Sequence, residues 1–453
     1  MEKKIALSIA GSDSSSGAGI QADLKSFSFL GLHGTTVVTC ITSQNTKQVK
    51  TIHKLPVEII ENQIDILFGD FHIDAVKTGM LYDEEIVKCV AKKILEYKLN
   101  PVVDPVMVAT SGDPLSQTTF IKSFKKYLLP KVFMVTANIP EAYEITGVKI
   151  NSIDDFKKPC QNLFSLGPKY VLIKGGHLNT KNAIDVLYDG KKFHEFSLPR
   201  IPNKKAHGSG CTLSALITGL LALGKIPVEA VRKAKYITWD MIRHGYVPGN
   251  GSDVLNHSCE IGMPPTLPDS SHFEVWFELK NAVEKLISML PLAFIPEVGV
   301  NFAFALKNAQ KLEDICAIDG RIVKTKDKPR ICGGIEFGVS KHIASIILAT
   351  MSVNKNARSA VNISYSKNTL ELCKKVGLSI GFFDRKNEPA NVPSTMEWGT
   401  KQAIAILGGV PDIIYDIGDI GKEPMIRMLG NDPEDVLSKL KKIIKKYDKN
   451  YIF

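Results

Sequence analysis

Short β-rich runs alternate with segments of helical periodicity along the first half of the chain, and this alternation restricts the fold more than any other feature. The β-rich runs are residues 5–10, 37–41, 102–104, 132–137 and 170–174. Helical spacing occupies residues 21–30, 84–97, 121–129 and 154–166. Strands that alternate with helices in this way are typical of a parallel sheet covered by helices on both faces. We therefore predict a doubly wound α/β fold for this part of the chain.

A proline-rich segment marks the end of this pattern. Residues 262–271 read Gly-Met-Pro-Pro-Thr-Leu-Pro-Asp-Ser-Ser, with three prolines among small polar residues. This composition suits an extended connector. A helical pattern at residues 273–289 follows, and α/β alternation then continues. We predict a first domain at residues 1–262, a linker at 263–271 and a second, smaller α/β domain at 272–453.

The composition argues against several classes of protein. The net charge is +10, but no basic tail or domain concentrates it, so we expect small anionic substrates and no nucleic acid. The eight cysteines include no CxxC pair and are too sparse for a disulfide scaffold. The N-terminal apolar run is too short for a signal peptide, and no apolar run reaches the ~18 residues of a membrane span. We expect a cytoplasmic protein without membrane contact; a homo-oligomer is compatible with this composition.

The segment His207-Gly-Ser-Gly-Cys211 leads directly into an apolar helical pattern. Backbone N–H groups at a glycine-rich helix start can hold an anion, so Gly208, Ser209 and Gly210 are candidate phosphate-binding residues. Cys211 would lie in the first turn, where the helix dipole favours the thiolate. A plain helix entry with a buried cysteine is equally compatible with these residues taken alone.

Polar side chains stand where three of the predicted strands end. Asp104 closes one strand, Asn138 and Glu141 follow the next, and Lys174 closes a third. Ligands of open α/β sheets bind outside the carboxyl ends of the strands. Carboxylates, an amide and a lysine at that edge suit Mg²⁺ and polyphosphate. Each group alone could be a turn cap or a surface charge, and the shared edge favours a common site.

Several motifs in order carry a resemblance to a known family. They are residues 10–25 (AGSDSSSGAGIQADLK), 44–46 (QNT), 77–80 (KTGM), 111–115 (SGDPL), 174–177 (KGGH) and 207–215 (HGSGCTLSA). Together they resemble hydroxymethylpyrimidine/phosphomethylpyrimidine kinase, one of the ribokinase-like kinases, over about residues 1–260. The resemblance implies two successive phosphorylations, of the hydroxymethyl group and then of its phosphate, with ATP as substrate and Mg²⁺ as the metal.

The resemblance also implies roles for individual residues. Cys211 matches the catalytic thiol of the family, at the position where sugar kinases of the superfamily carry an aspartate base. The positions that match or lie beside the pyrimidine-binding residues are Gly11, Asp23, Gln44, Met80 and Val106. A kinase for pyridoxal-type substrates, which shares the superfamily, is the alternative.

Phosphate and metal positions follow from the same resemblance. Lys174 matches a polyphosphate contact. Asn138 and Glu141 match an element that organises Mg²⁺ and water, and Asp104 is a further candidate for the metal. These four residues are the polar groups that the strand pattern already places at one edge of the sheet.

Residues 272–453 do not continue the kinase pattern. Residues 329–342 (PRICGGIEFGVSKH) place a Gly-Gly pair before an apolar helical pattern at 343–350, which suits an anion at a helix start. Arg330 could bind phosphate in a bidentate manner, and Glu336 and His342 are candidate metal or acid/base groups. His342 could equally face solvent. The Gly/Asp-rich segment 416–424 is a second candidate for phosphate or Mg²⁺, or else a surface turn.

This second half resembles the non-barrel, ThiN-type thiamine-phosphate synthase, which occurs fused behind the same kinase. The resemblance implies the joining of a pyrimidine diphosphate to thiazole phosphate with release of pyrophosphate, and Arg330 and His342 match the proposed catalytic pair. Related domains act as thiamine-phosphate sensors and tend to lack the arginine, so a kinase with a sensing domain is the alternative. We predict a bifunctional enzyme of thiamine biosynthesis.

Overall fold

The chain consists of two compact units, Met1–Met263 and Pro264–Phe453. The computed structural model describes residues 3–108, 112, 113, 115, 116, 119–202, 204, 206–259, 265, 267–389, 392 and 394–450. Of the predicted linker, residues 263, 264 and 266 lie outside the described residues. Ser270 and Ser271 already belong to helix α9 (Ser270–Met289), whose N-terminus is capped by Asp269.

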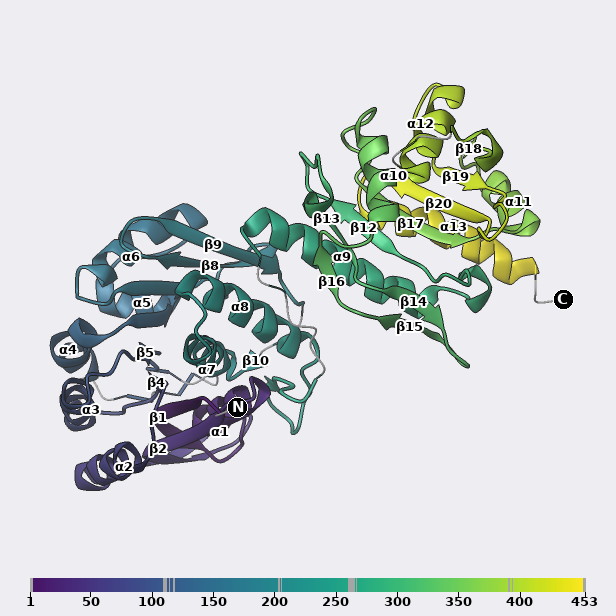
Figure 1. The fold of residues 1–453 in the computed structure, drawn as a ribbon. Coiled ribbons are helices and arrows are strands. Elements are labelled where there is room, and N and C mark those ends of the chain that lie inside the picture. Colours follow the sequence, from purple (N-terminus) through teal and green to yellow (C-terminus); the bar gives the residue numbers. More distant parts are fainter. Residues whose placement is uncertain are drawn as a thin grey trace. The chain divides into compact units, whose positions relative to one another are not determined.

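The first unit is built on one large sheet (Figure 1). Among the described residues its strands follow the order β3-β2-β1-β4-β5-β6-β7-β8-β9. Neighbours from β2 to β7 run parallel, whereas β3, β8 and β9 are antiparallel additions at the two edges. The strands are β1 (Ile5–Asp13), β2 (His33–Gln44), β3 (Val49–Lys54), β4 (Ala75–Thr78), β5 (Val102–Val103), β6 (Met134–Asn138), β7 (Tyr170–Lys174), β8 (Asn182–Tyr188) and β9 (Phe193–Pro199).

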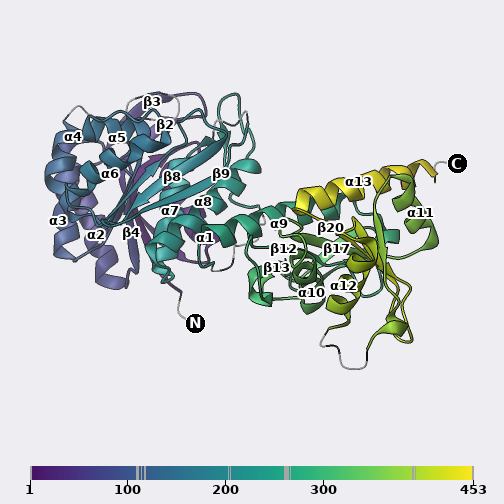
Figure 2. The same ribbon diagram turned by 90° about the horizontal axis from the view of Figure 1, so that it is seen from above.

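Helices cover both faces of this sheet (Figure 2). One face carries the larger apolar core, to which five helices contribute: α2 (Val57–Asp70), α3 (Glu84–Glu96), α4 (Phe120–Ser123), α5 (Ile139–Thr146) and α6 (Lys157–Phe164). The other face is covered by α1 (Gly19–Phe29) and α7 (Ser209–Ala222), with α8 (Pro227–Arg243) packed on α7. The predicted doubly wound fold is confirmed.

Two stretches differ from the sequence expectation. The elements β3, α2 and β4 were not indicated by the sequence pattern, because β3 is a half-exposed edge strand and α2 leaves Ile59 and Ile66 exposed beside the buried Ile60 and Ile64. The helix expected at residues 121–129 is instead α4 followed by a π-helical turn and a 3-10 turn. Pro130 lies in that last turn and cannot donate the hydrogen bond of a regular helix.

The second unit is a smaller α/β layer structure. Its described strands form a sheet of order β16-β13-β12-β17-β20-β19-β18, in which all neighbours are antiparallel except β18 and β19. Strands β14 (Arg321–Lys324) and β15 (Pro329–Cys332) pair separately as a hairpin. The sheet strands are β12 (Phe302–Ala305), β13 (Ile315–Ile318), β16 (Ile335–Phe337), β17 (Ser359–Ser364), β18 (Ile380–Phe382), β19 (Ile413–Asp416) and β20 (Met425–Gly430).

Helices α10 (Lys341–Met351) and α12 (Thr395–Leu407) pack on one face of this sheet, where their apolar side chains form a common core with Ile414 and Leu429. Helices α9 and α13 (Pro433–Asn450) pack together; α9 contacts β12, β13 and β16, and α13 contacts β17 and β20. Helix α11 (Lys367–Lys375) packs on α13. In the described part of the chain, no helix is both long enough and apolar enough to cross a membrane.

Because each unit has its own apolar core, we expect each to fold when expressed alone. Fragments 1–262 and 272–453 should each be soluble and give a cooperative thermal transition by circular dichroism. Each transition should lie within a few degrees of the corresponding transition of the full chain. Aggregation of both fragments would contradict this and indicate one integrated core.

Candidate active sites

A cavity of about 770 Å³ opens at the carboxyl ends of the parallel strands in the first unit. This is the edge at which open α/β sheets bind their ligands. The cavity is lined by every site residue that the sequence places in this unit: Gly11, Asp23, Gln44, Met80, Asp104, Val106, Asn138, Glu141, Lys174, Gly208, Ser209, Gly210 and Cys211. The fold therefore brings together residues that lie up to two hundred positions apart in the sequence.

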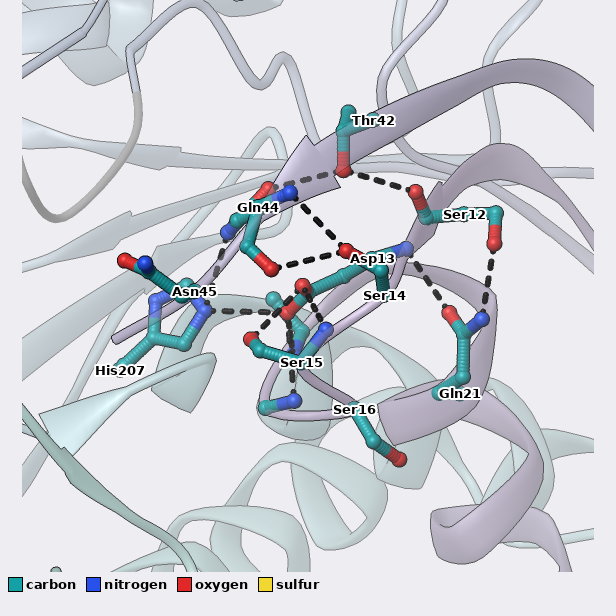
Figure 3. A network of polar contacts seen from close by, with 12 residues as sticks. Ser12, Asp13, Ser14, Ser15, Ser16, Gln21, Thr42, Gln44, Asn45 and His207 are labelled. Carbon is teal, nitrogen blue, oxygen red and sulfur yellow. Dashed lines mark hydrogen bonds and ion pairs between the residues drawn. The ribbon is translucent and has the colours of Figure 1, made fainter. Parts of the chain in front are cut away.

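The serine-rich loop after β1 is organised by the carboxylate of Asp13 (Figure 3). This carboxylate accepts hydrogen bonds from the backbone N–H and the hydroxyl of Ser15 at 2.8 and 2.7 Å, and from the backbone N–H of Ala18 at 2.8 Å. Nε2 of His207 lies 3.1 Å from it. Burial alone would raise the pKa of Asp13, but His207 and the loop donors outweigh burial and lower it to about 2. Asp13 is therefore a charged anchor for the loop.

Gln44 joins this network from the end of β2 (Figure 3). Its side-chain amide lies 3.2 Å from Nε2 of His207 and 3.2 Å from the hydroxyl of Thr42. Because Asp13 is ionised, Nε2 of His207 carries a proton and donates it to Asp13. Oε1 of Gln44 accepts the hydroxyl of Thr42, and Nε2 of Gln44 faces Nε2 of His207. Gln44 also lines the cavity.

A fully buried ion pair forms the floor of the cavity. Nζ of Lys77 lies 2.6 Å from Asp23, and both side chains are 0% exposed. Asp23 also accepts the hydroxyl of Ser8 at 2.5 Å. Burial disfavours the charge of Lys77, but Asp23 outweighs burial and holds the pKa of the lysine above its ordinary value. Lys77 belongs to a motif visible in the sequence, but its pairing with a carboxylate 54 positions away was not predicted.

A second cluster of charged side chains lies at the carboxyl ends of β5, β6 and β7. Nζ of Lys174 lies 2.6 Å from Asp104 and 4.0 Å from Glu141. Asn138 and Glu141 form a reciprocal capping box at the start of α5, with hydrogen bonds of 2.7 and 2.8 Å. Asn138 and Glu141 therefore cap the helix and line the cavity at the same time. Burial raises the pKa of Glu141 to about 7, with Lys174 opposing it.

The carboxylates of Asp104 and Glu141 fit a Mg²⁺ ion that arrives with a nucleotide. Mg²⁺ keeps several waters and takes one or two protein carboxylates together with substrate phosphates. Among the described residues, no group of three or more His, Cys, Asp or Glu side chains is placed to hold a metal by itself. Asp104 and Glu141 remain candidate carboxylates for a metal that also binds phosphate.

Cys211 lies in the first turn of α7, after the glycine turn. Gly208 has φ +81°, and a Cβ there would lie 1.8 Å from the carbonyl oxygen of Gly17, so the two loops touch backbone to backbone. The sequence predicts a thiolate at this helix start. In the structure burial prevails and raises the pKa of Cys211 to about 11, although Lys77 acts in the opposite direction.

The opposite wall of the cavity is apolar. Met80 packs with Cys40 and Leu115, and Val106 lies against this cluster. Gly11 faces the same wall, where a Cβ would come within 2.8 Å of Sγ of Cys40 and 3.1 Å of Sδ of Met80. A flat ring can therefore lie between the apolar wall and the polar floor. Of the SGDPL motif, Ser111 and Pro114 lie outside the described residues.

In the second unit, Arg330 and His342 lie on separate elements. Arg330 is exposed on β15, and His342 is exposed in the first turn of α10. Partial burial of its ring lowers the pKa of His342, and so do the charges of Arg321, Arg427 and Arg385; Arg330 is not among these groups. The hairpin register nevertheless places Arg330 and Arg321 on the same face. Arg330 pairs with Val323, and Val323 lies two residues after Arg321 on β14, so their side chains point to the same side.

The sequence-predicted segment 416–424 has a different role from the expected one. Asp416 is fully buried and is held by Nε of Arg385 at 2.7 Å and Nη1 of Arg427 at 2.6 Å. It is therefore unavailable as an open Mg²⁺ ligand. Neither arginine was predicted as a site residue. Asp416 lies in the segment that the sequence singles out, but its pairing with Arg385 and Arg427 was not predicted. Glu336 is exposed on β16.

Comparison with known proteins gives a consistent picture. Residues 13–256 match the phosphomethylpyrimidine kinase family, and residues 278–442 match the thiamine-phosphate synthase ThiN family. A bifunctional thiamine biosynthesis protein, ThiDN, of Methanocaldococcus jannaschii is 36% identical over 98% of this chain and 99% of that protein. A hydroxymethylpyrimidine/phosphomethylpyrimidine kinase of Bacillus subtilis is 42% identical over 56% of this chain and 94% of its own length.

A solved structure is similar to the first unit. The pyridoxal kinase from Staphylococcus aureus, in complex with AMP-PCP and pyridoxal, gives a TM-score of 0.52 at 36% sequence identity. The match covers 57% of this chain and 94% of that chain. At this identity and coverage the first unit has the ribokinase-like fold.

The contact between Gly208 and Gly17 gives a stability prediction. Gly208→Ala should lower the free energy of unfolding by about 2–5 kcal/mol, because a left-handed alanine costs ~1–2 kcal/mol and overpacking adds ~1–3. Gly224→Ala is the matched control: its φ is +78° and nothing lies within 4 Å of a Cβ there. That variant should lose only ~1–2 kcal/mol. Urea unfolding of both variants measures the difference, and equal losses would contradict the close approach.

Proposed function

The chain belongs to the family of bifunctional thiamine biosynthesis proteins that join a phosphomethylpyrimidine kinase to a ThiN-type thiamine-phosphate synthase, and on that premise we propose how its residues divide the work. The protein is an enzyme with two activities. It phosphorylates hydroxymethylpyrimidine and its monophosphate with ATP, and it couples the resulting diphosphate to thiazole phosphate. Neither a pyridoxal-type kinase nor a kinase with a sensing domain is favoured by a relationship that extends over both units.

One observation supports the proposal for the kinase: the start of helix α7, the ammonium group of Lys174 and the carboxylate of Asp104 lie next to one another. A Cβ at Gly210 would lie 3.2 Å from Nζ of Lys174 and 3.5 Å from Oδ2 of Asp104. Backbone N–H groups of residues 208–211 and the ammonium of Lys174 can therefore bind the same phosphate chain. Mg²⁺ held by Asp104 and Glu141 would neutralise phosphate charge during transfer.

The pyrimidine would lie on the other side of Cys211. The apolar wall of Gly11, Met80 and Val106 accepts the ring, while Asp23 and Gln44 offer hydrogen-bond partners for its nitrogen atoms. The hydroxymethyl oxygen would then attack the γ-phosphorus of ATP, with ADP as leaving group. Cys211 takes the proton of that hydroxyl. In the second round the phosphate oxygen of the monophosphate is the nucleophile.

For the synthase we propose that the diphosphate leaves with both electrons of its C–O bond and that the thiazole nitrogen donates its lone pair to the resulting pyrimidine methylene cation. Arg330 stabilises the negative charge that develops on the leaving diphosphate, and His342 orients or protonates it. The shared face of Arg330 and Arg321 on the hairpin, together with the influence of Arg321 on His342, supports this pairing.

Replacement of the thiol tests the kinase proposal. Cys211→Ala should lower kcat by about 10²–10⁴, the range for loss of a positioned proton acceptor, while the KM for hydroxymethylpyrimidine stays within a few-fold. Cys259→Ala is the control, because this cysteine lies in the same unit and its Sγ–H donates to the carbonyl of Asn256. Wild-type turnover in Cys211→Ala would remove the catalytic role.

The pKa of Cys211 adds a pH dependence. A thiol with a pKa of about 11 is almost entirely protonated at pH 7. As long as the pH stays below the pKa, the thiolate fraction increases about tenfold for each unit by which the pH rises. kcat/KM reports groups of the free enzyme, so it should rise from pH 7 to 9 without a plateau. A plateau reached by pH 8 would contradict the assignment of Cys211 as the proton acceptor.

Substitutions in the second unit test the synthase proposal. Arg330→Lys and His342→Ala should each lower thiamine phosphate formation by about 10²–10³, because a lysine cannot reproduce the planar fork of an arginine and a missing donor leaves charge unstabilised. ATP-dependent phosphorylation of the pyrimidine should be unchanged, since the kinase residues lie in the other unit. Coupling at the wild-type rate in both variants would move the catalytic assignment elsewhere.

A further inference from the structure

Three charged side chains meet at the ends of β19 and β20 in the second unit. Asp416 is the last residue of β19, Arg427 lies on β20, and Arg385 lies in the turn after β18. The side chains of Asp416, Arg427 and Arg385 are 0%, 3% and 9% exposed. We call these three residues the Asp416 cluster. Charges this deeply buried are costly unless each is paired.

The carboxylate of the cluster has no capacity left for a ligand. Oδ1 of Asp416 accepts Nε of Arg385 at 2.7 Å and the backbone N–H of Gly418 at 2.8 Å. Oδ2 accepts Nη1 of Arg427 at 2.6 Å and Nη2 of Arg385 at 3.3 Å. Four hydrogen bonds fill the acceptor sites of a carboxylate. Asp416 therefore acts only inward, by fixing the two arginines.

The arginines, in contrast, keep donors and charge to spare. Two guanidinium groups share one carboxylate, which leaves one positive charge in excess. Within the described part of the chain, Nη1 of Arg385 and both Nε and Nη2 of Arg427 have no hydrogen-bond acceptor. The ring of Phe383 lies 5.5 Å below the guanidinium of Arg427 and fixes its plane. Fixed, unpaired guanidinium donors beside an excess charge are suited to an anion with several oxygens.

The position of the cluster connects it with the residues of the coupling step. Helix α10 packs on the same core as Phe383 and Ile414, and His342 lies in the first turn of that helix. Arg427 on β20 is paired with Asn362 on the neighbouring strand β17. The side-chain oxygen of Asn362 accepts a hydrogen bond from the backbone N–H of Asn301. The charges of Arg385, Arg427 and Arg321 all act on His342. The cluster and His342 therefore belong to one electropositive region.

We propose that the Asp416 cluster is the diphosphate seat of the synthase, in which Arg385 and Arg427 contact the diphosphate of the pyrimidine substrate and Asp416 is a positioning residue. This inference rests on the proposed function of the second unit. During coupling the C–O bond to the diphosphate breaks and its electrons stay on the diphosphate oxygen. Arginines that are already fixed by Asp416 stabilise this charge without reorganisation.

The test is calorimetric titration of the full chain with pyrophosphate, with the kinase cavity saturated by a non-hydrolysable ATP analogue. Arg385→Gln should weaken pyrophosphate binding about 10- to 100-fold, the effect of losing a charge-assisted donor. Arg385→Lys should fall between this variant and the wild type, because it keeps the charge but loses the fork. Thermal melts check that the variants are folded, and Arg385→Lys remains informative if Arg385→Gln is not.

Arg358→Gln is the matched control. This arginine belongs to the same unit, stacks on Phe304 at 4.4 Å and donates to the carbonyl of Ala305 at 3.1 Å, but it pairs with no member of the cluster. Pyrophosphate affinity should be unchanged in this variant. An affinity within twofold of wild type in both Arg385→Gln and Arg385→Lys would overturn the proposal.

A parallel titration with thiazole phosphate separates the two phosphate sources. Weakening of pyrophosphate binding supports a diphosphate seat, whereas weakening of thiazole phosphate binding alone would overturn it. Thiamine phosphate formation by the wild-type chain from supplied diphosphate is measured on the same sample. If the wild type does not couple, the proposed synthase function fails; if it couples and the arginine variants bind pyrophosphate normally, only the present inference fails.

Discussion

The buried ion pair between Lys77 and Asp23 is the interaction on which the first unit most depends. Either charge alone would cost several kcal/mol in the interior, so the pair holds only while both partners stay within hydrogen-bond distance. It joins β4 to α1 across β1, where Ser8 adds a further hydrogen bond. The cavity floor is therefore fixed before any ligand binds. Lys174 at the end of β7 and Asp104 just after β5 form a second ion pair at the same edge of the sheet.

The walls of the cavity depend on contacts between distant segments. The loop after β1 is folded around Asp13, and His207 reaches that carboxylate from the segment before α7. A Cβ at Gly208 would lie 1.8 Å from the carbonyl oxygen of Gly17, and a Cβ at Gly17 would lie 2.5 Å from the ring of His207, so neither position leaves room for a side chain. The loop after β1 and the start of α7 are thus in close contact; in the proposed site the loop faces the pyrimidine and the helix start faces the phosphates. A single displaced backbone there would disturb both halves of the kinase site.

Sequence patterns predicted much of this arrangement because the relevant signals are local. The strand at 170–174 and the helix at 84–97 occur where the patterns place them. Residues at strand ends meet at one edge because parallel strands share a direction. Pairings were not predictable, because the partners of Lys77 and of Asp416 lie 54, 31 and 11 residues away. The roles of Asn138 and Glu141 could not be separated from the sequence, because a helix cap and the wall of a phosphate site require the same residue types.

Both units solve the same electrostatic problem in a similar way. Each buries cations beside a carboxylate that holds them in place: Lys77 beside Asp23, and Arg385 and Arg427 beside Asp416. We propose that each unit uses the remaining positive charge to bind phosphate groups. We propose that one chain uses these two phosphate-binding sites in succession. The most direct test incubates the intact protein with hydroxymethylpyrimidine, thiazole phosphate, Mg²⁺ and ATP. The account predicts that thiamine phosphate forms and that its formation requires ATP. Accumulation of pyrimidine diphosphate without thiamine phosphate would contradict it.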